Sequence, residues 1–129
     1  MYSFGTTIIA TEDEAVEKVT NALKDEGFGV LTEINVQAVM KAKIDVDMKP
    51  YRILGACNPH LARQAIEAEP DIGLLLPCNV LVRDEGNGKM FVGFMDPKAV
   101  LTLVDRPEVV ELAQTVREKL ERVCDVVSD

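Results

Sequence analysis

The chain has 129 residues, of which 47% are hydrophobic and 28% charged, the size and composition of one globular domain with its own core. Its formal net charge of −8 argues against nucleic acid or an anionic membrane as a partner, because both are bound through clustered Lys and Arg. No apolar run is long enough for a membrane-spanning helix, which needs about 18 residues.

The cysteines and the first residues of the chain bear on where the protein works. Cys57, Cys78 and Cys124 are an odd number of cysteines. Residues 2–10 have the character of a strand, and no basic segment followed by an apolar one marks them as an export signal. Because disulfides form mainly in exported proteins, we expect free thiols and a cytoplasmic protein.

The first third of the chain predicts strands alternating with helices. Residues 2–10 form the first strand, and Thr11 with Glu14 has the spacing of a capping box at the start of a helix. Apolar residues alternate over 28–34, as in a strand, and recur at helical spacing over 36–44. Two strands and two helices are therefore expected before residue 45.

The middle of the chain holds two predicted strands, each with a cysteine. Residues 51–57 are a short apolar strand, after which Asn58 as N-cap and Pro59 in the first turn start a third helix. The segment 72–83 is almost continuously apolar, too much so for an exposed strand, and Pro77 predicts a bulge or bend within it.

The last third predicts a hairpin followed by two helices. Residues 86–88, Gly-Asn-Gly, tolerate the backbone angles of a tight reversal and connect 72–83 to a strand over 89–95. A short helix follows over 97–104, and a long one begins at Pro107. The fold class is therefore α+β, a two-layer single domain over residues 1–129 with a mostly antiparallel sheet packed against helices.

Two Cys-Asn pairs are the candidate functional residues. Cys57 ends one strand directly before a helix, and Cys78 lies within another strand. If the strands are neighbours, the two thiols converge near the first-turn amides of that helix, where the helix dipole favours a thiolate or a bound anion. The alternative is that both cysteines are small buried hydrophobes, as most free cysteines are.

Three polar residues join these cysteines in the candidate ligand site. Asn58 is either a helix cap or a ligand contact, whereas Asn79 lies in an apolar run and is expected to be buried and to need partners. His60 is close enough in sequence to Cys57 for a Cys/His nucleophilic pair, or is an exposed residue at a helix start. No metal site is expected, because the cysteine spacing matches no zinc pattern and His60 is the only histidine.

The residues around both Cys-Asn pairs carry a resemblance. Segments 51–59 and 73–80, extended by 27–30 and 95–97, make the chain similar to the family catalogued as domain of unknown function 302. The resemblance implies a small α+β domain that assembles as a homodimer, with no agreed activity or cofactor. The family pattern has positions that match Cys57, Asn58, Pro59, Pro77, Cys78 and Asn79.

Three functional hypotheses follow. The first is a non-enzymatic cytoplasmic homodimer that binds a small molecule or ion at the Cys57/Cys78 site. The second is a thiol-dependent redox or hydrolytic enzyme, which requires an exposed cysteine of low pKa with His60 or another base in reach. The third is an interaction module without a ligand, whose signature is a large apolar surface, with the last helix as the candidate.

Overall fold

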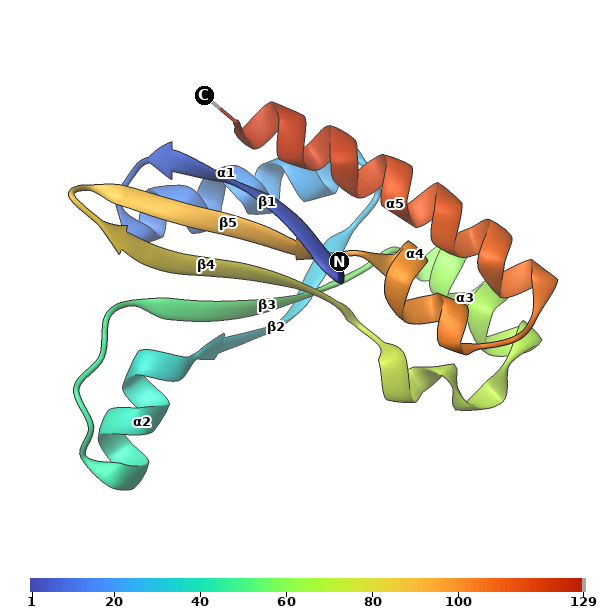
Figure 1. Ribbon diagram of the computed structural model, residues 1–129, viewed down its shortest axis with the longest axis horizontal. Coiled ribbons are helices and arrows are strands. Elements are labelled where there is room, and N and C mark those ends of the chain that lie inside the picture. The colour runs from blue at the N-terminus through green and yellow to red at the C-terminus, as the bar shows by residue number, and fades with distance from the viewer. Residues whose placement is uncertain (129) are drawn as a thin grey trace.

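The computed structural model describes residues 1–128 and shows one five-stranded sheet with helices (Figure 1). The strands are β1 (Ser3–Ile9), β2 (Gly29–Asn35), β3 (Tyr51–Cys57), β4 (Cys78–Gly86) and β5 (Lys89–Met95). The helices are α1 (Glu12–Asp25), α2 (Val36–Ile44), α3 (Pro59–Ala68), α4 (Pro97–Val100) and α5 (Pro107–Val127), with 3-10 segments η1 (Pro70–Leu75) and η2 (Leu101–Leu103). The predicted α+β class is confirmed.

The sheet is antiparallel throughout, with strand order β1-β5-β4-β3-β2. The β4–β5 hairpin is at its centre, and Gly86, Asn87 and Gly88 take the positive φ values of 88°, 56° and 75° that the tight reversal needs. The predicted hairpin is confirmed. On the other side of the hairpin, β4, with Cys78, pairs with β3, with Cys57.

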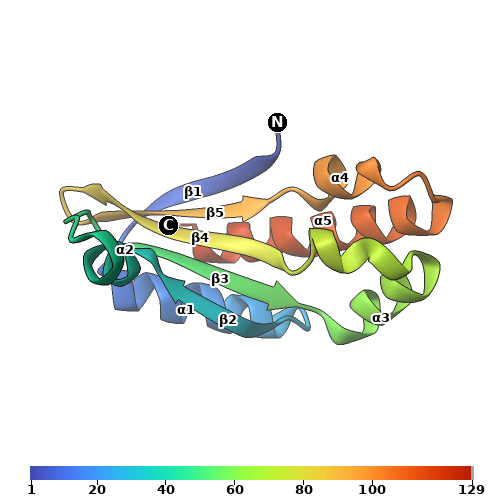
Figure 2. The ribbon, with the colours of Figure 1, turned by 90° about the horizontal axis from the view of Figure 1, so that it is seen from below.

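Helices α1 and α5 cover one face of this sheet (Figures 1 and 2). At the start of α1, the Glu14 amide donates to Thr11 Oγ1 at 3.2 Å and the Thr11 amide donates to Glu14 Oε1 at 2.9 Å, as the capping box predicts. The buried residues of α5 are Val109, Ala113, Val116, Leu120, Val123 and Val127. Burying each larger side chain contributes roughly 1.5–3 kcal/mol, which explains why this long amphipathic helix lies on the sheet.

Within residues 1–128, no helix packs along the strands on the other face of the sheet. Seen from below, the five strands lie in front of α1 and α5 (Figure 2). Helix α2 extends beyond the sheet next to β2 and β3, has no buried residue, and ends at Asp45 in the left-handed conformation with φ 54° (Figure 1). We call this uncovered side of the five strands the open face.

The segment 72–83 differs from its prediction as one bent strand. Its first residues belong to η1, and the strand begins only at Cys78, after a cis bond between Leu76 and Pro77. The apolar residues of η1 serve a second small core under α3 and α5, in which Ile72 is 1% exposed and packs with Leu101 and Val109. Residues 72–83 contribute apolar side chains to both the second core and the main core, so their sequence pattern resembles that of one long apolar strand.

Among residues 1–128, no helix combines the length and the apolar character that crossing a membrane requires.

Candidate functional site

A cavity of about 340 Å³ lies where the end of β3 and the start of β4 meet α3, η1 and α5. We call it the inner cavity. Its wall includes Phe28, Leu31, Leu61, Ala62, Ile66, Leu76, Leu101, Leu112 and Val116. The polar side chains among its lining residues are those of Thr32, Asn58, Cys57 and Cys78, and no charged residue is among them. Three of the five residues in the predicted site, Cys57, Asn58 and Cys78, therefore line one cavity.

The register of β3 and β4 brings the two cysteines to this place. Ala56 is paired with Cys78, so Cys57 is one residue beyond that pair at the end of β3. Gly55 has no side chain, and this allows two further residues of the cavity wall to lie against β3. A Cβ on Gly55 would lie 2.2 Å from Thr32 Oγ1 and 2.8 Å from Pro77 Cγ, two residues that line the inner cavity. Only glycine lets β2 and the turn before β4 come this close to β3.

The oxygen and the nitrogen of the Asn58 side-chain amide both form hydrogen bonds with the backbone. Its Oδ1 accepts from the Leu61 amide at 3.3 Å, which caps α3, and its Nδ2 donates to the Glu26 carbonyl at 3.4 Å. The residue thus joins the start of α3 to the end of α1. The predicted cap is confirmed, and the side chain holds the cavity wall in position.

Both cavity cysteines have pKa values shifted upward. Burial raises the pKa of Cys57, and it raises the pKa of the buried Cys78 to about 11, with the nearby Cys57 adding a smaller increase. At neutral pH both side chains are therefore protonated thiols. A nucleophilic thiolate requires a lowered pKa, and here both pKa values are raised. The two cysteines therefore contribute polarisable, apolar side chains to the cavity wall.

His60 and Asn79, the other two predicted site residues, lie elsewhere. His60 is exposed and lines a separate pocket with Arg63 and Glu67. Asn79 is exposed on the open face, paired with Gly55, because its neighbours Cys78 and Val80 take the buried positions of the alternating strand. The prediction that Asn79 is buried is wrong.

The remaining cysteine and the acidic residues form no further cluster. Cys124 is a free thiol, like Cys57 and Cys78, and packs against the main core near the end of α5. Within residues 1–128, no group of three or more His, Cys, Asp or Glu side chains has the arrangement of a metal site.

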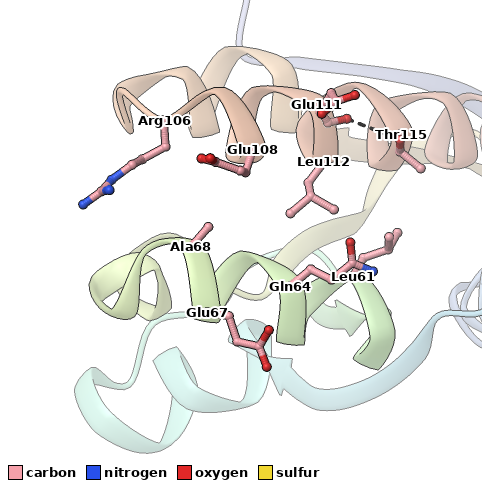
Figure 3. Close-up of a pocket in the computed structure, with 9 residues that line it drawn as sticks. All are labelled: Leu61, Gln64, Glu67, Ala68, Arg106, Glu108, Glu111, Leu112 and Thr115. Carbon is pink, nitrogen blue, oxygen red and sulfur yellow. Dashed lines mark hydrogen bonds between the residues drawn. The ribbon is translucent and has the colours of Figure 1, made fainter.

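A second, more open groove of about 670 Å³ runs between α3 and α5, and we call it the outer groove (Figure 3). Leu61 and Leu112 line both spaces, and Figure 3 shows Leu112 pointing from α5 toward α3. Glu108 and Glu111 also line the outer groove. The two leucines therefore separate an uncharged inner cavity from an acidic, solvent-facing groove.

Sequence reasoning missed the leucines and Val116 of the cavity wall. On α5 they follow the same helical spacing as the residues that pack against the sheet, so periodicity assigns both sets to the core. Only their position beyond the end of the sheet, opposite α3, leaves empty volume beside them.

Comparison with known proteins agrees with this architecture. The model of the family described as domain of unknown function DUF302 matches residues 4–127. Among curated proteins none matches the chain. The crystal structure of an uncharacterised conserved DUF302 protein from Bacillus stearothermophilus is similar, with a TM-score of 0.90 and 28% sequence identity over 98% of each chain. The family match includes every residue that lines the inner cavity, and the chain belongs to the DUF302 family.

Proposed function

We propose that this protein binds a small, uncharged and mostly apolar molecule in the inner cavity, with Cys57 and Cys78 in the wall of the site. The observation that supports it is a cavity of about 340 Å³ bounded by aliphatic and aromatic side chains and a few polar groups. Ligand sites have this character, with volumes of roughly 300–1,000 Å³ and a small number of polar groups that orient the ligand.

The lining favours a neutral ligand over an ion. No charged side chain lines the inner cavity, so an ion bound there would have no partner of opposite charge. Burying an unpaired charge costs far more than burying an apolar group, which gains free energy on leaving water. An apolar molecule that offers one acceptor to a thiol or to the Thr32 hydroxyl fits the wall best.

The hypothesis of a thiol-dependent redox or hydrolytic enzyme has less support. Its nucleophile needs a depressed pKa and a base in reach, whereas burial raises the pKa of Cys57 and His60 lines another pocket. We therefore assign the cysteines a binding role.

The test uses naphthalene, an uncharged apolar fluorophore, as the probe in a titration of the whole protein. Ala62 lines the inner cavity, and Ala62→Phe places a ring in that space. Ala42 on α2 is exposed, so Ala42→Phe adds the same ring to a helix surface away from the cavity. We expect saturable binding of one naphthalene per chain in the wild type and in Ala42→Phe, and at least about tenfold weaker binding in Ala62→Phe, a loss of 1.4 kcal/mol or more.

Two results contradict the proposal. One is the absence of saturable binding to the wild type, and the other is equal binding to Ala62→Phe and Ala42→Phe. Thermal unfolding of both variants shows whether each remains folded, and a cavity-filling ring that keeps the melting temperature while removing the probe is the expected pattern.

A further inference from the structure

The inner cavity has a closed end and an end that reaches the solvent. At the closed end its lining residues are buried: Phe28 is 3% exposed, Ala56 1% and Val116 8%. Two other lining residues, Leu31 of β2 at 68% and Ile66 of α3 at 47%, are exposed. A side chain that borders a cavity and is also exposed to solvent lies where the cavity opens, and we call this end the mouth.

The segment η1 also borders the mouth. Gly73 is an exposed residue of η1 that lines the inner cavity. A Cβ added to Gly73 would meet no atom within 4 Å, so the space beside it is open. Residues of β2, α3 and η1 thus border one opening.

A β-bulge in β2 places two consecutive side chains at the mouth. In a regular strand, successive side chains point to opposite faces of the sheet. Leu31 and Thr32 are consecutive and both exposed, yet both line the inner cavity. The register explains this, because the pairing passes from Val30 with Ala56 directly to Thr32 with Gly55 and leaves Leu31 as an extra residue. Bulges of this kind redirect side chains next to functional sites, and this one turns Leu31 toward the mouth.

Partners for a polar group of a ligand lie at the mouth and not at the closed end. Thr32 carries a hydroxyl at the exposed end of the cavity. The Asn58 amide already bonds the backbone through both its oxygen and its nitrogen. At the closed end the polar side chain is the buried thiol of Cys78, a weak donor and a weak acceptor. A polar group therefore loses its hydrogen bonds at the closed end, whereas Thr32 and water supply them at the mouth.

We infer that the ligand is an amphiphile, with an apolar body in the inner cavity and one polar end at the mouth beside Leu31 and Thr32. This inference rests on the proposed binding of an apolar molecule and adds its orientation and chemical class. At ~30 Å³ for a water-sized group, the cavity of about 340 Å³ has room for roughly eleven such groups, enough for a chain of about eight carbon atoms. Because the polar end meets water, it can carry a charge without burying it, so the requirement for a neutral ligand applies to the body alone.

The first test compares two alcohols as competitors of naphthalene on the whole protein. Octanol has one hydroxyl, and the straight-chain octanediol has the same carbon chain with a hydroxyl at each end. We expect octanol to displace naphthalene and the diol to bind at least about tenfold more weakly, because its second hydroxyl enters the closed end. Equal competition by the two alcohols would mean that the closed end accepts a polar group, and would overturn the inference.

The second test locates the polar end with a charge placed on either side of the cavity. Leu31→Lys adds an ammonium group at the mouth, and Thr115→Lys adds the same group at an exposed position in the outer groove. The readout is the affinity for octanoate divided by the affinity for octanol, which cancels any loss of apolar contact. We expect Leu31→Lys to raise this ratio about two- to fivefold over the wild type, and less at high salt, and Thr115→Lys to leave it unchanged.

A second mouth variant guards against misfolding of Leu31→Lys, which thermal unfolding detects. Ile66→Lys adds the charge from α3 and should raise the same ratio. A ratio raised by Thr115→Lys and not by the mouth variants would place the polar end in the outer groove and overturn the inference. Naphthalene that binds while octanol fails to displace it would also overturn the inference, and would leave the proposed function intact. A wild type that binds no naphthalene overturns the proposed function and this inference together.

Discussion

The helix-covered face of the sheet and the inner cavity at its end are built from the same kinds of apolar residues, but one is filled and the other is hollow. Over the sheet, Leu54, Val80 and Leu120 are all at 0% exposure within one continuous cluster. Beyond the end of β3, Leu61 and Leu112 face about 340 Å³ of empty volume. Close packing stabilises the first region, whereas the second keeps apolar surface available to a ligand.

The same substitution in the two regions gives the largest expected difference. Leu120→Ala removes a fully buried side chain and should lower the free energy of unfolding by about 2–5 kcal/mol. Leu112→Ala removes a half-buried side chain that already borders a cavity, and should cost roughly half as much or less. Urea unfolding of both variants measures the two costs, and equal costs would mean that the inner cavity is not open in solution.

Gly55 connects the two regions, because it belongs to β3 and underlies the cavity wall. Gly55→Ala places a methyl group 2.2 Å from Thr32 Oγ1 and 2.8 Å from Pro77 Cγ, and the proline ring cannot rotate away. We expect a loss of about 1–3 kcal/mol in the free energy of unfolding, together with loss of naphthalene binding. Gly29→Ala, on β2 and outside the cavity lining, is the control, because an added Cβ there meets nothing within 4 Å, and it should bind as the wild type does.

The pH dependence of stability gives a smaller effect, located at Cys78. Its thiol titrates near 9.0 in an ordinary environment and at about 11 in the folded chain. Between these values the unfolded chain releases a proton that the folded chain keeps, so the free energy of unfolding falls as pH rises, by up to about 1.4 kcal/mol per pH unit. Below the ordinary value this contribution is constant.

Urea unfolding at about pH 8 and about pH 10 measures that slope, and Cys78→Ala separates it from the titration of lysines and tyrosines. We expect the wild type to lose more stability than Cys78→Ala over this interval. Identical losses would show that Cys78 is not buried as the structure places it.

Sequence patterns predicted the elements well because their signals are local. Thr11 with Glu14, Asn58 with Pro59, and the turn at 86–88 each mark a boundary by a hydrogen bond or backbone angle that a few neighbouring residues determine. The prediction for Asn79 is wrong because residues 72–83 form one nearly continuous apolar run in the sequence, which hides the alternation of β4. Within β4 alone, Cys78, Val80 and Val82 alternate with Asn79, Leu81 and Arg83, and the alternation assigns Asn79 to the open face.

The candidate site was predictable only in part, because its cavity depends on the tertiary arrangement. The proximity of Cys57 to Cys78 follows from the β3–β4 register, which the sequence predicted only conditionally. The hollow beside Leu61 and Leu112 depends on how far α3 lies from α5, and no residue pattern encodes that distance.

The most direct test of the inner cavity as a ligand site is the rate at which Cys57 is alkylated at neutral pH, with and without saturating naphthalene. Mass spectrometry of peptides gives the rate for each cysteine separately, and Cys124, packed near the far end of α5, is the internal control. We predict that Cys57 reacts more slowly than a free thiol, and that naphthalene slows it further without changing Cys124. A Cys57 that reacts faster than a free thiol, or is unaffected by bound naphthalene, would contradict the account.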